Sequence, residues 1–429
     1  MTSTRFVSRL THDTLALILA GGRGSRLGVL TEWRTKPAVP FGGKFRIIDF
    51  TLSNCLNSGI RKIAVLTQYK SHSLIRHLLQ GWNRFNSELG EFIDLVPAQQ
   101  WLDEESWYQG TADAVFQTLD IIESYNPTYV LILAGDHIYS MDYGEMVAAH
   151  VAAEADLTLA CTAVPRGTAH QFGVLTVDGS GRINAFAEKP KDPQPMRGNP
   201  DMAMVSMGIY VFSLDYLRDQ LQRDAADAKS SHDFGKDVIP HALSKGHLLH
   251  PYEFSNARST RGSYWRDVGT LDAYFQANVE ILSPKPPLDI YDPSWPIMTH
   301  QPQLPPAQFI GDGETCQASN SMVSGGCLIQ ESTLDTTLLF SNVRVHEGCR
   351  LQGVLALPGC EIGAGSQLTN VILDNQCQVP EDTVIGLDAE SDKRRFHVTE
   401  GGVVVVNRDM LGQGSHYMPP IPAEASTGP

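Results

Sequence analysis

The chain has 429 residues, with 33 Lys and Arg against 48 Asp and Glu, which gives a formal net charge of −15. Charged residues make up 19% of the chain, below the ~25% of ordinary soluble domains, and this argues against disorder. The acidic balance argues against a nucleic-acid partner, since such proteins usually carry a basic surface. At about 100–200 residues per domain, the length predicts two or three domains.

The cysteine content indicates a reducing compartment. The seven cysteines are scattered and include no C-x-x-C pair, so we expect free thiols without zinc or disulfides. No signal peptide is visible, and the first long apolar run, residues 15–20, is too short to cross a membrane. We therefore expect a cytoplasmic protein with no membrane partner.

The first two thirds of the chain alternate short apolar runs with helical stretches. The runs at 15–20, 62–67 and 129–134 have the length of buried parallel strands, and the helical stretches lie at 71–82 and 112–125. This alternation predicts an α/β domain, Rossmann-like, with a mostly parallel sheet, over residues 14–282. Later strands are expected in a mixed arrangement, at 157–164, 173–178, 183–188 and 207–212.

A proline-rich connector and a repeat follow. Residues 283–306 contain eight prolines, which break helices and strands. Between 307 and 411, apolar residues recur every 17 positions in three registers: Leu328, Val345, Ile362 and Val379; Leu334, Leu351, Leu368 and Ile385; and Leu338, Leu355 and Ile372. About three apolar positions per turn predict a left-handed parallel β-helix of about four coils. Residues 1–14 and the C-terminal tail, 412–429, are expected to be loose.

A glycine-rich loop follows the first strand. Gly21, Gly22 and Gly24 allow the backbone to approach a phosphate, and Arg23, Arg26 and Lys36 supply positive charge. The loop is neither a dinucleotide fingerprint, because position 27 is Leu, nor a P-loop, because no G-K-[ST] follows. The combination predicts a site for a phosphate-bearing ligand.

These residues, together with four longer blocks, resemble one enzyme family. The blocks are 41–50 (FGGKFRIIDF), 107–114 (WYQGTADA), 231–237 (SHDFGKD) and 264–270 (YWRDVGT). They resemble bacterial glucose-1-phosphate adenylyltransferases, also called ADP-glucose pyrophosphorylases, from about residue 14 to 411. The resemblance implies a nucleotidyltransferase domain followed by a left-handed β-helix. It also implies transfer of the adenylyl group of ATP to glucose 1-phosphate for glycogen synthesis.

The resemblance also implies roles for individual residues. Asp136 follows the third strand and, on sequence alone, fits a metal ligand and a turn or N-cap residue equally well; Asp267 also fits the N-cap of a helix at 271–278. The family assigns both to Mg²⁺, and it assigns Arg26, Lys36 and Asp136 to catalysis. The matching ATP-binding residues are Gly21, Gly22, Arg23, Gly24, Arg26, Lys36, Gln68 and Gln100. The matching glucose 1-phosphate residues are Tyr108, Gly173, Glu188, Lys189 and Ser206, although each has a purely structural interpretation as well.

Several alternatives remain open on the sequence. Four other kinds of protein share parts of the pattern: a sister enzyme using UTP or dTTP, a bifunctional pyrophosphorylase–acetyltransferase with a longer β-helix, a non-catalytic regulatory subunit, and a structural β-helix protein. His137 and His232 lie beside the motifs, but phosphate oxygens are nucleophilic at neutral pH, so we assign neither as a general base.

Regulation and assembly follow from the resemblance. The family is generally allosteric and tetrameric, and we expect a homotetramer assembled through the β-helix. In one subgroup a bisphosphate effector binds a cationic pocket between the domains. This chain keeps Arg34, Arg46 and Arg408 of that pocket but departs from it at Trp33, Pro40, Ser124, Asn375 and Gly412. We therefore expect an anionic effector less charged than a bisphosphate, such as a sugar monophosphate or a carboxylate. The alternative is that Arg46 only pairs with Asp49 and no effector binds.

Overall fold

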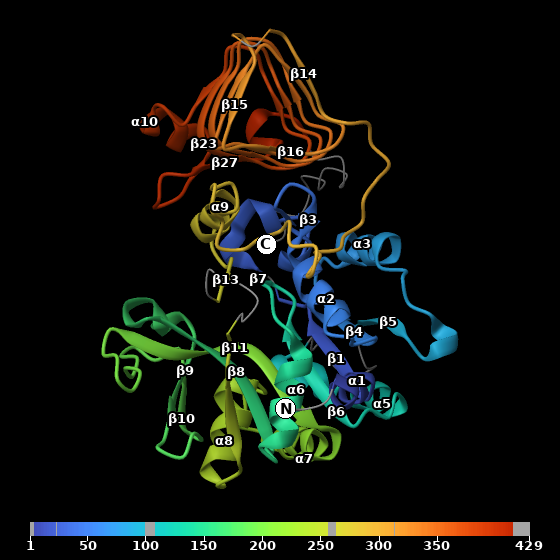
Figure 1. The fold of residues 1–429 in the computed structure, drawn as a ribbon. Coiled ribbons are helices and arrows are strands. Elements are labelled where there is room, and N and C mark those ends of the chain that lie inside the picture. The colour runs from blue at the N-terminus through green and yellow to red at the C-terminus, as the bar shows by residue number, and fades with distance from the viewer. Residues whose placement is uncertain (1–3, 23, 99–107, 256–262, 313, 415–429) are drawn as a thin grey trace, which may run out of the picture.

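The computed structural model describes residues 4–22, 24–98, 108–255, 263–312 and 314–414. An α/β domain occupies the N-terminal part and a triangular coil of strands lies above it in Figure 1. Among the described residues, no helix combines the length and the apolar content needed to cross a lipid bilayer. All seven cysteines are free, as the sequence predicted.

A nine-stranded sheet forms the centre of the N-terminal domain. Its order is β10-β9-β11-β6-β1-β4-β5, with β8 on β11 and β12 on β8. The strands are β1 (Thr14–Leu19), β4 (Lys62–Thr67), β5 (Phe92–Pro97), β6 (Tyr129–Ala134), β8 (Leu157–Pro165), β9 (Gly173–Val177), β10 (Ile183–Glu188), β11 (Met202–Ser213) and β12 (Leu249–Glu253). Strands β6, β1, β4 and β5 are parallel, and β11 is antiparallel to β6. The predicted parallel sheet and the mixed later strands are confirmed.

Helices cover both faces of this sheet, which explains why its central strands are continuously apolar. Leu15 and Leu17 pack into one buried cluster, whereas Ala16 and Ile18 pack into another on the opposite face. These helices are α1 (Thr4–His12), α2 (Ile47–Asn57), α3 (His72–Gly81), α4 (Thr111–Phe116), α5 (Leu119–Ser124), α6 (Tyr143–Ala152), α7 (Leu214–Ala225) and α8 (Ile239–Ser244). Helix α9 (Leu271–Glu280) packs instead in a cluster shared with the β-helix.

Two expectations about helices are wrong. The stretch 112–125 is not one helix but α4 and α5, and Thr118 between them departs from helical geometry, with a φ of −108° and a ψ of 10°. Residues 4–12, expected to be loose, form α1, whose Leu10 is 8% exposed and belongs to the same apolar cluster as Met146 of α6. Residues 415–429 of the predicted tail lie outside the described residues.

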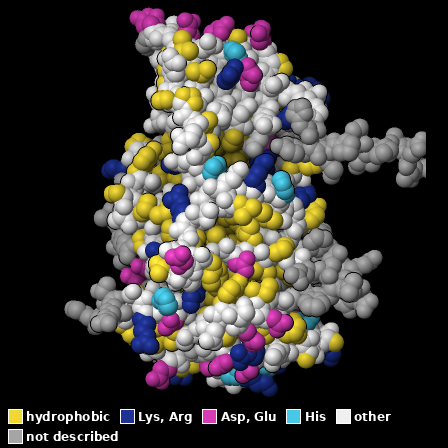
Figure 2. Space-filling view, turned by 90° about the vertical axis from the view of Figure 1, so that its right-hand side faces the viewer, with side chains coloured by type: hydrophobic (Ala, Val, Ile, Leu, Met, Phe, Trp, Pro, Cys, Tyr) yellow, Lys and Arg dark blue, Asp and Glu magenta, His cyan; other side chains and the backbone are white. Residues whose placement is uncertain are grey.

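The proline-rich connector contains no helix or strand and runs along the side of the N-terminal domain (Figure 1). Trp295 is 6% exposed, and its indole N–H donates to the side chain of Asn54 at 2.9 Å. The backbone N–H of Met298 donates to Ser53 Oγ at 2.8 Å. The connector is therefore fixed to α2. On the face drawn in Figure 2, hydrophobic side chains are exposed across the middle of the molecule, and acidic side chains gather at its top edge.

The C-terminal domain is a left-handed parallel β-helix. One side is a five-stranded sheet in the order β14-β17-β20-β22-β24, so the coil has one strand more on this side than the spacing indicated. The strands are β14 (Gln308–Ile310), β15 (Gln317–Ser319), β16 (Met322–Val323), β17 (Leu328–Gln330), β18 (Thr333–Asp335), β19 (Leu338–Leu339), β20 (Arg344–Val345), β21 (Arg350–Ala356), β22 (Glu361–Ile362), β23 (Gln367–Leu373), β24 (Gln378–Val379), β25 (Val384–Ile385), β26 (His397–Val398) and β27 (Val404–Val406); helix α10 (Ala389–Arg395) interrupts the last coil.

The structure corrects one of the three registers. Ile329, not Leu328, pairs with Val345, so this coil is shorter by a single position than the sequence spacing indicated, and Leu328 is only half-buried. The predicted pairing of Leu351 with both Leu334 and Leu368 is confirmed. The register of Leu338, Leu355 and Ile372 repeats as predicted, but these side chains belong to a cluster that includes Tyr274 and Phe275 of α9, not to the coil interior. That register therefore marks the face on which the two domains pack.

The corrected register predicts a difference between two adjacent substitutions. Ile329→Ala should lower the free energy of unfolding by about 2–5 kcal/mol, because Ile329 is 0% exposed inside the coil. Leu328→Ala should cost about 1 kcal/mol or less. Urea unfolding of both variants, followed by circular dichroism, measures the two costs. Equal costs, or a larger cost at Leu328, would contradict the register.

Candidate active site

A cavity of about 670 Å³ opens at the carboxyl ends of the central strands. Thirteen of the residues assigned to the site line it: Gly21, Gly22, Gly24, Arg26, Lys36, Gln68, Tyr108, Asp136, Gly173, Glu188, Lys189, Ser206 and Asp267. Arg23 and Gln100 lie outside the described residues. Residues from separate parts of the chain thus meet in one place, although their individual roles remain predictions.

The glycine loop connects β1 to a short 3₁₀ helix, η1 (Ser25–Thr31). Gly24 has a φ of +59°, and a Cβ there would lie 3.0 Å from Cβ of Lys36. Any larger residue would therefore be strained and would push Lys36 away. Apart from the chain neighbours of Gly22, no atom of the described residues lies within 4 Å of the place that a Cβ would take there, so this side of the glycine has room for a ligand.

Two carboxylates meet because two short strands pair. Asp136 follows β6 and precedes β7 (His137–Tyr139), and Asp267 ends β13 (Trp265–Asp267). Strands β7 and β13 are antiparallel, with His137 opposite Asp267. Of the two interpretations left open for Asp267, the N-cap role is excluded, because Thr270 caps α9 by accepting the N–H of Ala273.

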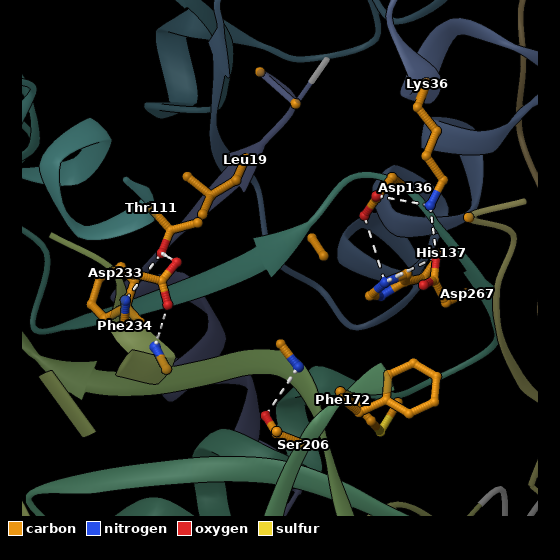
Figure 3. A pocket seen from close by; sticks show the side chains of 18 of the residues that line it. Leu19, Lys36, Thr111, Asp136, His137, Phe172, Ser206, Asp233, Phe234 and Asp267 are labelled. Atoms are coloured by element: carbon orange, nitrogen blue, oxygen red, sulfur yellow. Dashed lines mark hydrogen bonds and ion pairs between the residues drawn. The ribbon is translucent and has the colours of Figure 1, made fainter. Parts of the chain in front are cut away.

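Lys36 joins the two carboxylates (Figure 3). Its Nζ donates to Oδ2 of Asp136 at 2.9 Å and to Oδ1 of Asp267 at 2.7 Å. Burial opposes the charge of Lys36, but the two carboxylates outweigh it and raise the pKa of the lysine. Burial likewise opposes the charge of Asp136, but Lys36 and His137 outweigh it and lower the pKa of this carboxyl. Lys36 and Asp136 are therefore charged near neutral pH.

This cluster is also a candidate metal centre. Side-chain ligand atoms of Asp136, His137 and Asp267 all lie within 4.8 Å of one another, and no other such trio occurs among the residues described. Nδ1 of His137 is buried without a hydrogen-bond partner. Arg26 is 61% exposed, and its Nη2 lies 3.8 Å from Oδ2 of Asp267. The guanidinium group can therefore reach a ligand at the mouth of the cavity.

A second polar group lines another part of the cavity. Glu188 ends β10, and Nζ of Lys189 lies 3.0 Å from its Oε1. Oε2 of Glu188 would be 2.9 Å from a Cβ at Gly173 and 2.7 Å from a Cβ at Gly235, so both glycines leave room for this carboxylate. Lys189 is 61% exposed and has a φ of +47°, so its ammonium group is accessible to an anion.

Tyr108, one of the assigned residues, remains neutral. Burial, helped by the charge of Asp113, raises the pKa of its phenol to about 12.

Some other lining residues received no role from the sequence. This part of the wall is formed by Thr111 and Asp233–Gly235, together with Phe172, Tyr210 and Trp265. Thr111 and Asp233 lie on the opposite side of the view from Lys36 in Figure 3. Both residues belong to blocks that carried the family resemblance, 107–114 and 231–237, so the resemblance could have pointed to them.

The three arginines assigned to an effector lie outside this cavity. Arg34 Nη2 donates to both carboxylate oxygens of Asp374, at 2.7 and 3.0 Å, and thereby joins the two domains. Arg46 donates to the carbonyl oxygen and the hydroxyl of Ser73. Asp49 instead accepts the backbone N–H of Arg46, so the side-chain pairing of these two residues is absent from the structure. Nε of Arg408 is buried without a partner.

Two family models match the chain. The model for nucleotidyl transferases matches residues 15–283, and the model for the GlmU-like C-terminal hexapeptide repeat matches residues 305–406. The matches follow the two domains of the structure.

Curated relatives match over nearly their whole length. A protein of Nitrosococcus oceani is 56% identical over 97% of this chain and 99% of its own. A protein of Methylococcus capsulatus is 55% identical over 97% and 98%, and one of Nitrosomonas europaea is 53% identical over 96% and 97%. All three are named glucose-1-phosphate adenylyltransferase. The chain belongs to the glucose-1-phosphate adenylyltransferase family of nucleotidyltransferases.

Proposed function

We propose that the protein transfers the adenylyl group of ATP to α-D-glucose 1-phosphate and releases ADP-glucose and pyrophosphate. The observation that carries the proposal is a cavity in which the glycine loop, the Lys36–Asp136–Asp267 cluster and the Glu188–Lys189 pair meet. The names of the relatives described above, which share more than half of their aligned residues with this chain, support the two substrates. We also propose that the reaction supplies glycogen synthesis in the cytoplasm.

The reaction requires that the two anionic substrates be aligned and that their negative charge be neutralised. A phosphate oxygen of glucose 1-phosphate forms a bond to the α-phosphorus of ATP, and the bond to pyrophosphate breaks on the opposite side. Arg26 and Lys36 attract the triphosphate, and Lys189 attracts the sugar phosphate. Glu188 accepts hydrogen bonds from sugar hydroxyls. No general base is needed, because the attacking oxygen is already anionic.

The donor set fits Mg²⁺. Carboxylate oxygens are the protein ligands that Mg²⁺ prefers, and Asp136 and Asp267 present them close together beside His137. A bound Mg²⁺ would neutralise negative charge on the phosphates. Because Lys36 already lies between the carboxylates, it holds them in place and competes with a cation for the same oxygens.

This competition predicts the effect of removing the lysine. Lys36→Ala should tighten the binding of Mn²⁺ in the absence of nucleotide by about tenfold, or about 1.4 kcal/mol. Electron paramagnetic resonance of free Mn²⁺ measures the Kd. Lys44→Ala, which removes an exposed lysine outside the cavity, is the control and should leave the Kd unchanged. Unchanged or weaker binding by Lys36→Ala would show that the lysine does not compete with the metal.

The proposed roles predict different kinetic effects for two residues. Lys189→Ala should raise the KM for glucose 1-phosphate at least about tenfold with little change in kcat, because it removes a ground-state contact. Asp136→Asn should instead lower kcat by about 100-fold, because charge stabilisation during transfer is lost. Lys191→Ala, an exposed neighbour outside the cavity, is the control. A wild-type KM for the sugar phosphate in Lys189→Ala would refute its assignment.

The substrates themselves require a direct test. The protein is incubated with Mg²⁺, pyrophosphate and, separately, ADP-glucose, UDP-glucose and dTDP-glucose. We expect ATP from ADP-glucose at a far higher rate than UTP or dTTP from the others. Preference for another nucleotide would reassign the protein to a sister enzyme, and no reaction with any would favour a regulatory subunit.

We propose further that an anionic metabolite binds between the domains near Arg34, Arg46 and Arg408. Burial lowers the pKa of Arg46 to about 10; the charge of Asp49 opposes this shift, and the charges of Arg34 and Arg76 add to it. Arg408 has a buried Nε without a partner. Since Asp374 already neutralises Arg34, few cations remain for a highly charged ligand.

This charge balance predicts the choice of effector. Fructose 6-phosphate or pyruvate should activate synthesis more than fructose 1,6-bisphosphate does. Initial rates with each compound, and with AMP as a candidate inhibitor, measure the preference. Strong activation by micromolar bisphosphate would contradict the prediction, and no response to any compound would favour an unregulated enzyme.

We also propose a homotetramer assembled through the β-helix. Large apolar side chains are exposed near both ends of the coil: Phe309 and Ile310 in β14, and Val384 and Leu387 near β25. Such surfaces are commonly covered in symmetric oligomers. Light scattering at micromolar concentration should give four times the chain mass, whereas a monomer would contradict the proposal.

A further inference from the structure

One wall of the cavity is formed by two loops from distant parts of the sequence. Gly110 and Thr111 lie at the start of α4, and Asp233, Phe234 and Gly235 belong to the block 231–237. The reaction described above assigns no role to His232 or to Asp224, which contacts it. Neither of these residues lines the cavity.

The two loops are joined through the backbone of His232. Its carbonyl oxygen accepts the N–H groups of Ala112, at 2.8 Å, and Asp113, at 3.2 Å. A Cβ at Gly110 would lie only 2.2 Å from the same oxygen, so the two chain segments are in direct backbone contact. The position of this one carbonyl group therefore fixes the start of α4.

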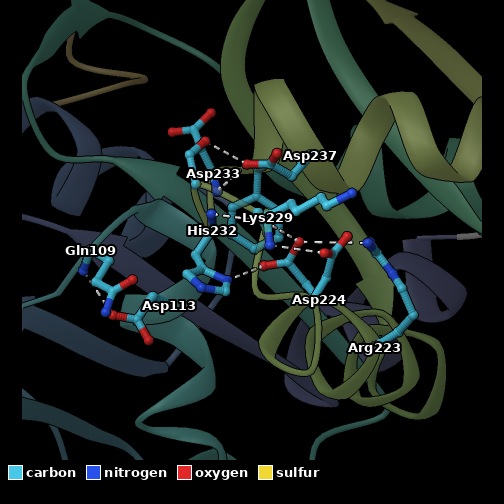
Figure 4. Close-up of polar contacts among 12 residues, drawn as sticks. Gln109, Asp113, Arg223, Asp224, Lys229, His232, Asp233 and Asp237 are labelled. Carbon is cyan, nitrogen blue, oxygen red and sulfur yellow. Dashed lines mark hydrogen bonds and ion pairs between the residues drawn. The ribbon is translucent and has the colours of Figure 1, made fainter.

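His232 adopts an uncommon backbone conformation, with a φ of +55°. Its ring contacts Asp224, a residue near the end of α7 that is 2% exposed (Figure 4). Nδ1 of His232 lies 2.9 Å from Oδ2 of Asp224, and Ser230 Oγ donates to Oδ1 at 2.9 Å. The N–H of His232 also donates to Ser230 Oγ. The buried carboxylate thus holds both residues of the turn.

The same turn places the cavity wall. Asp233 follows His232 directly, and its Oδ2 accepts a hydrogen bond from Thr111 Oγ1 at 3.1 Å. Its Oδ1 accepts the N–H groups of Gly235 and Lys236. Gly235 is the residue whose Cβ would lie 2.7 Å from Glu188, the proposed sugar ligand. A shift of the turn would therefore move the wall against Glu188.

We propose that Asp224 and His232 are a positioning pair that sets the sugar-phosphate side of the cavity. The pair acts through the His232 carbonyl and the following Asp233–Gly235 segment, and it touches no substrate. The proposal rests on the proposed function for its kinetic consequence, but its structural consequence, a fixed junction between the two loops, is independent of that function.

Two substitutions at one position separate the side-chain contact from the backbone conformation. His232→Gly accepts a positive φ but removes the contact with Asp224. His232→Asn also tolerates a positive φ and places an amide N–H close to where Nδ1 of the imidazole lies, so it can still donate to Asp224. We expect His232→Gly to raise the KM for glucose 1-phosphate about tenfold with kcat within about threefold. His232→Asn should remain within about twofold of the wild type.

Amide hydrogen exchange provides a readout that does not depend on catalysis. The amides of Ala112 and Asp113 should exchange at least about tenfold faster in His232→Gly than in His232→Asn or the wild type. Asp224→Asn, which keeps the size but not the charge of the carboxylate, should give an intermediate rate. An unchanged KM and exchange rate in His232→Gly would overturn the proposal, as would equal losses in the Gly and Asn variants. If His232→Gly exchanged faster but the wild-type protein lacked the transferase activity, the proposed function would be refuted and the positioning role of the pair would still be supported.

Discussion

The ammonium group of Lys36, shared between two carboxylates, is the interaction on which the cavity depends. It lies 2.9 Å from Asp136, in the turn between β6 and β7, and 2.7 Å from Asp267, at the end of β13. Without a cation between them, these carboxylates would repel each other at the position where a polyanionic substrate must bind. The lysine in this place lowers the pKa of Asp136, and in the proposed reaction it would offer the triphosphate a positive charge that needs no reorganisation when the substrate arrives.

The same segment of chain connects this centre to the β-helix. Arg34, two residues before Lys36, pairs with Asp374 of the β-helix, and Glu32 accepts a hydrogen bond from Asn407. Glu32 and Arg34 thus contact the second domain, whereas Lys36, two residues further on, enters the cavity. The apolar register of Leu338, Leu355 and Ile372 packs beside α9, which begins four residues after Asp267. These contacts connect the interface between the domains to Lys36 and Asp267, so the regulation proposed above would have a physical route to the cavity.

The sequence predicted seven of the nine strands of the main sheet and the coil from local apolar patterns, and the connector from its density of prolines; it missed β5 and β12. It did not predict the bridging by Lys36, whose partners are 100 and 231 residues away. Periodicity alone also could not distinguish Leu355, which faces the other domain, from Leu351, which faces the coil interior, since both recur with the same spacing. The glycine loop, Arg26 and Lys36 were recognised from their residue types, and the other assigned lining residues were found through a family resemblance. The wall held by His232 depends on backbone contacts that leave little mark on a single sequence.

The central claim is that Asp136 and Asp267 act as one unit on one metal–phosphate centre. A double-mutant cycle tests it most directly, with kcat/KM for ATP measured for Asp136→Asn, Asp267→Asn and the variant carrying both. If the two carboxylates serve one centre, the double variant should be about as slow as the slower single variant, because either change alone disables the unit. If the losses in kcat/KM multiply instead, the two residues act independently, and the claim of a single centre is wrong.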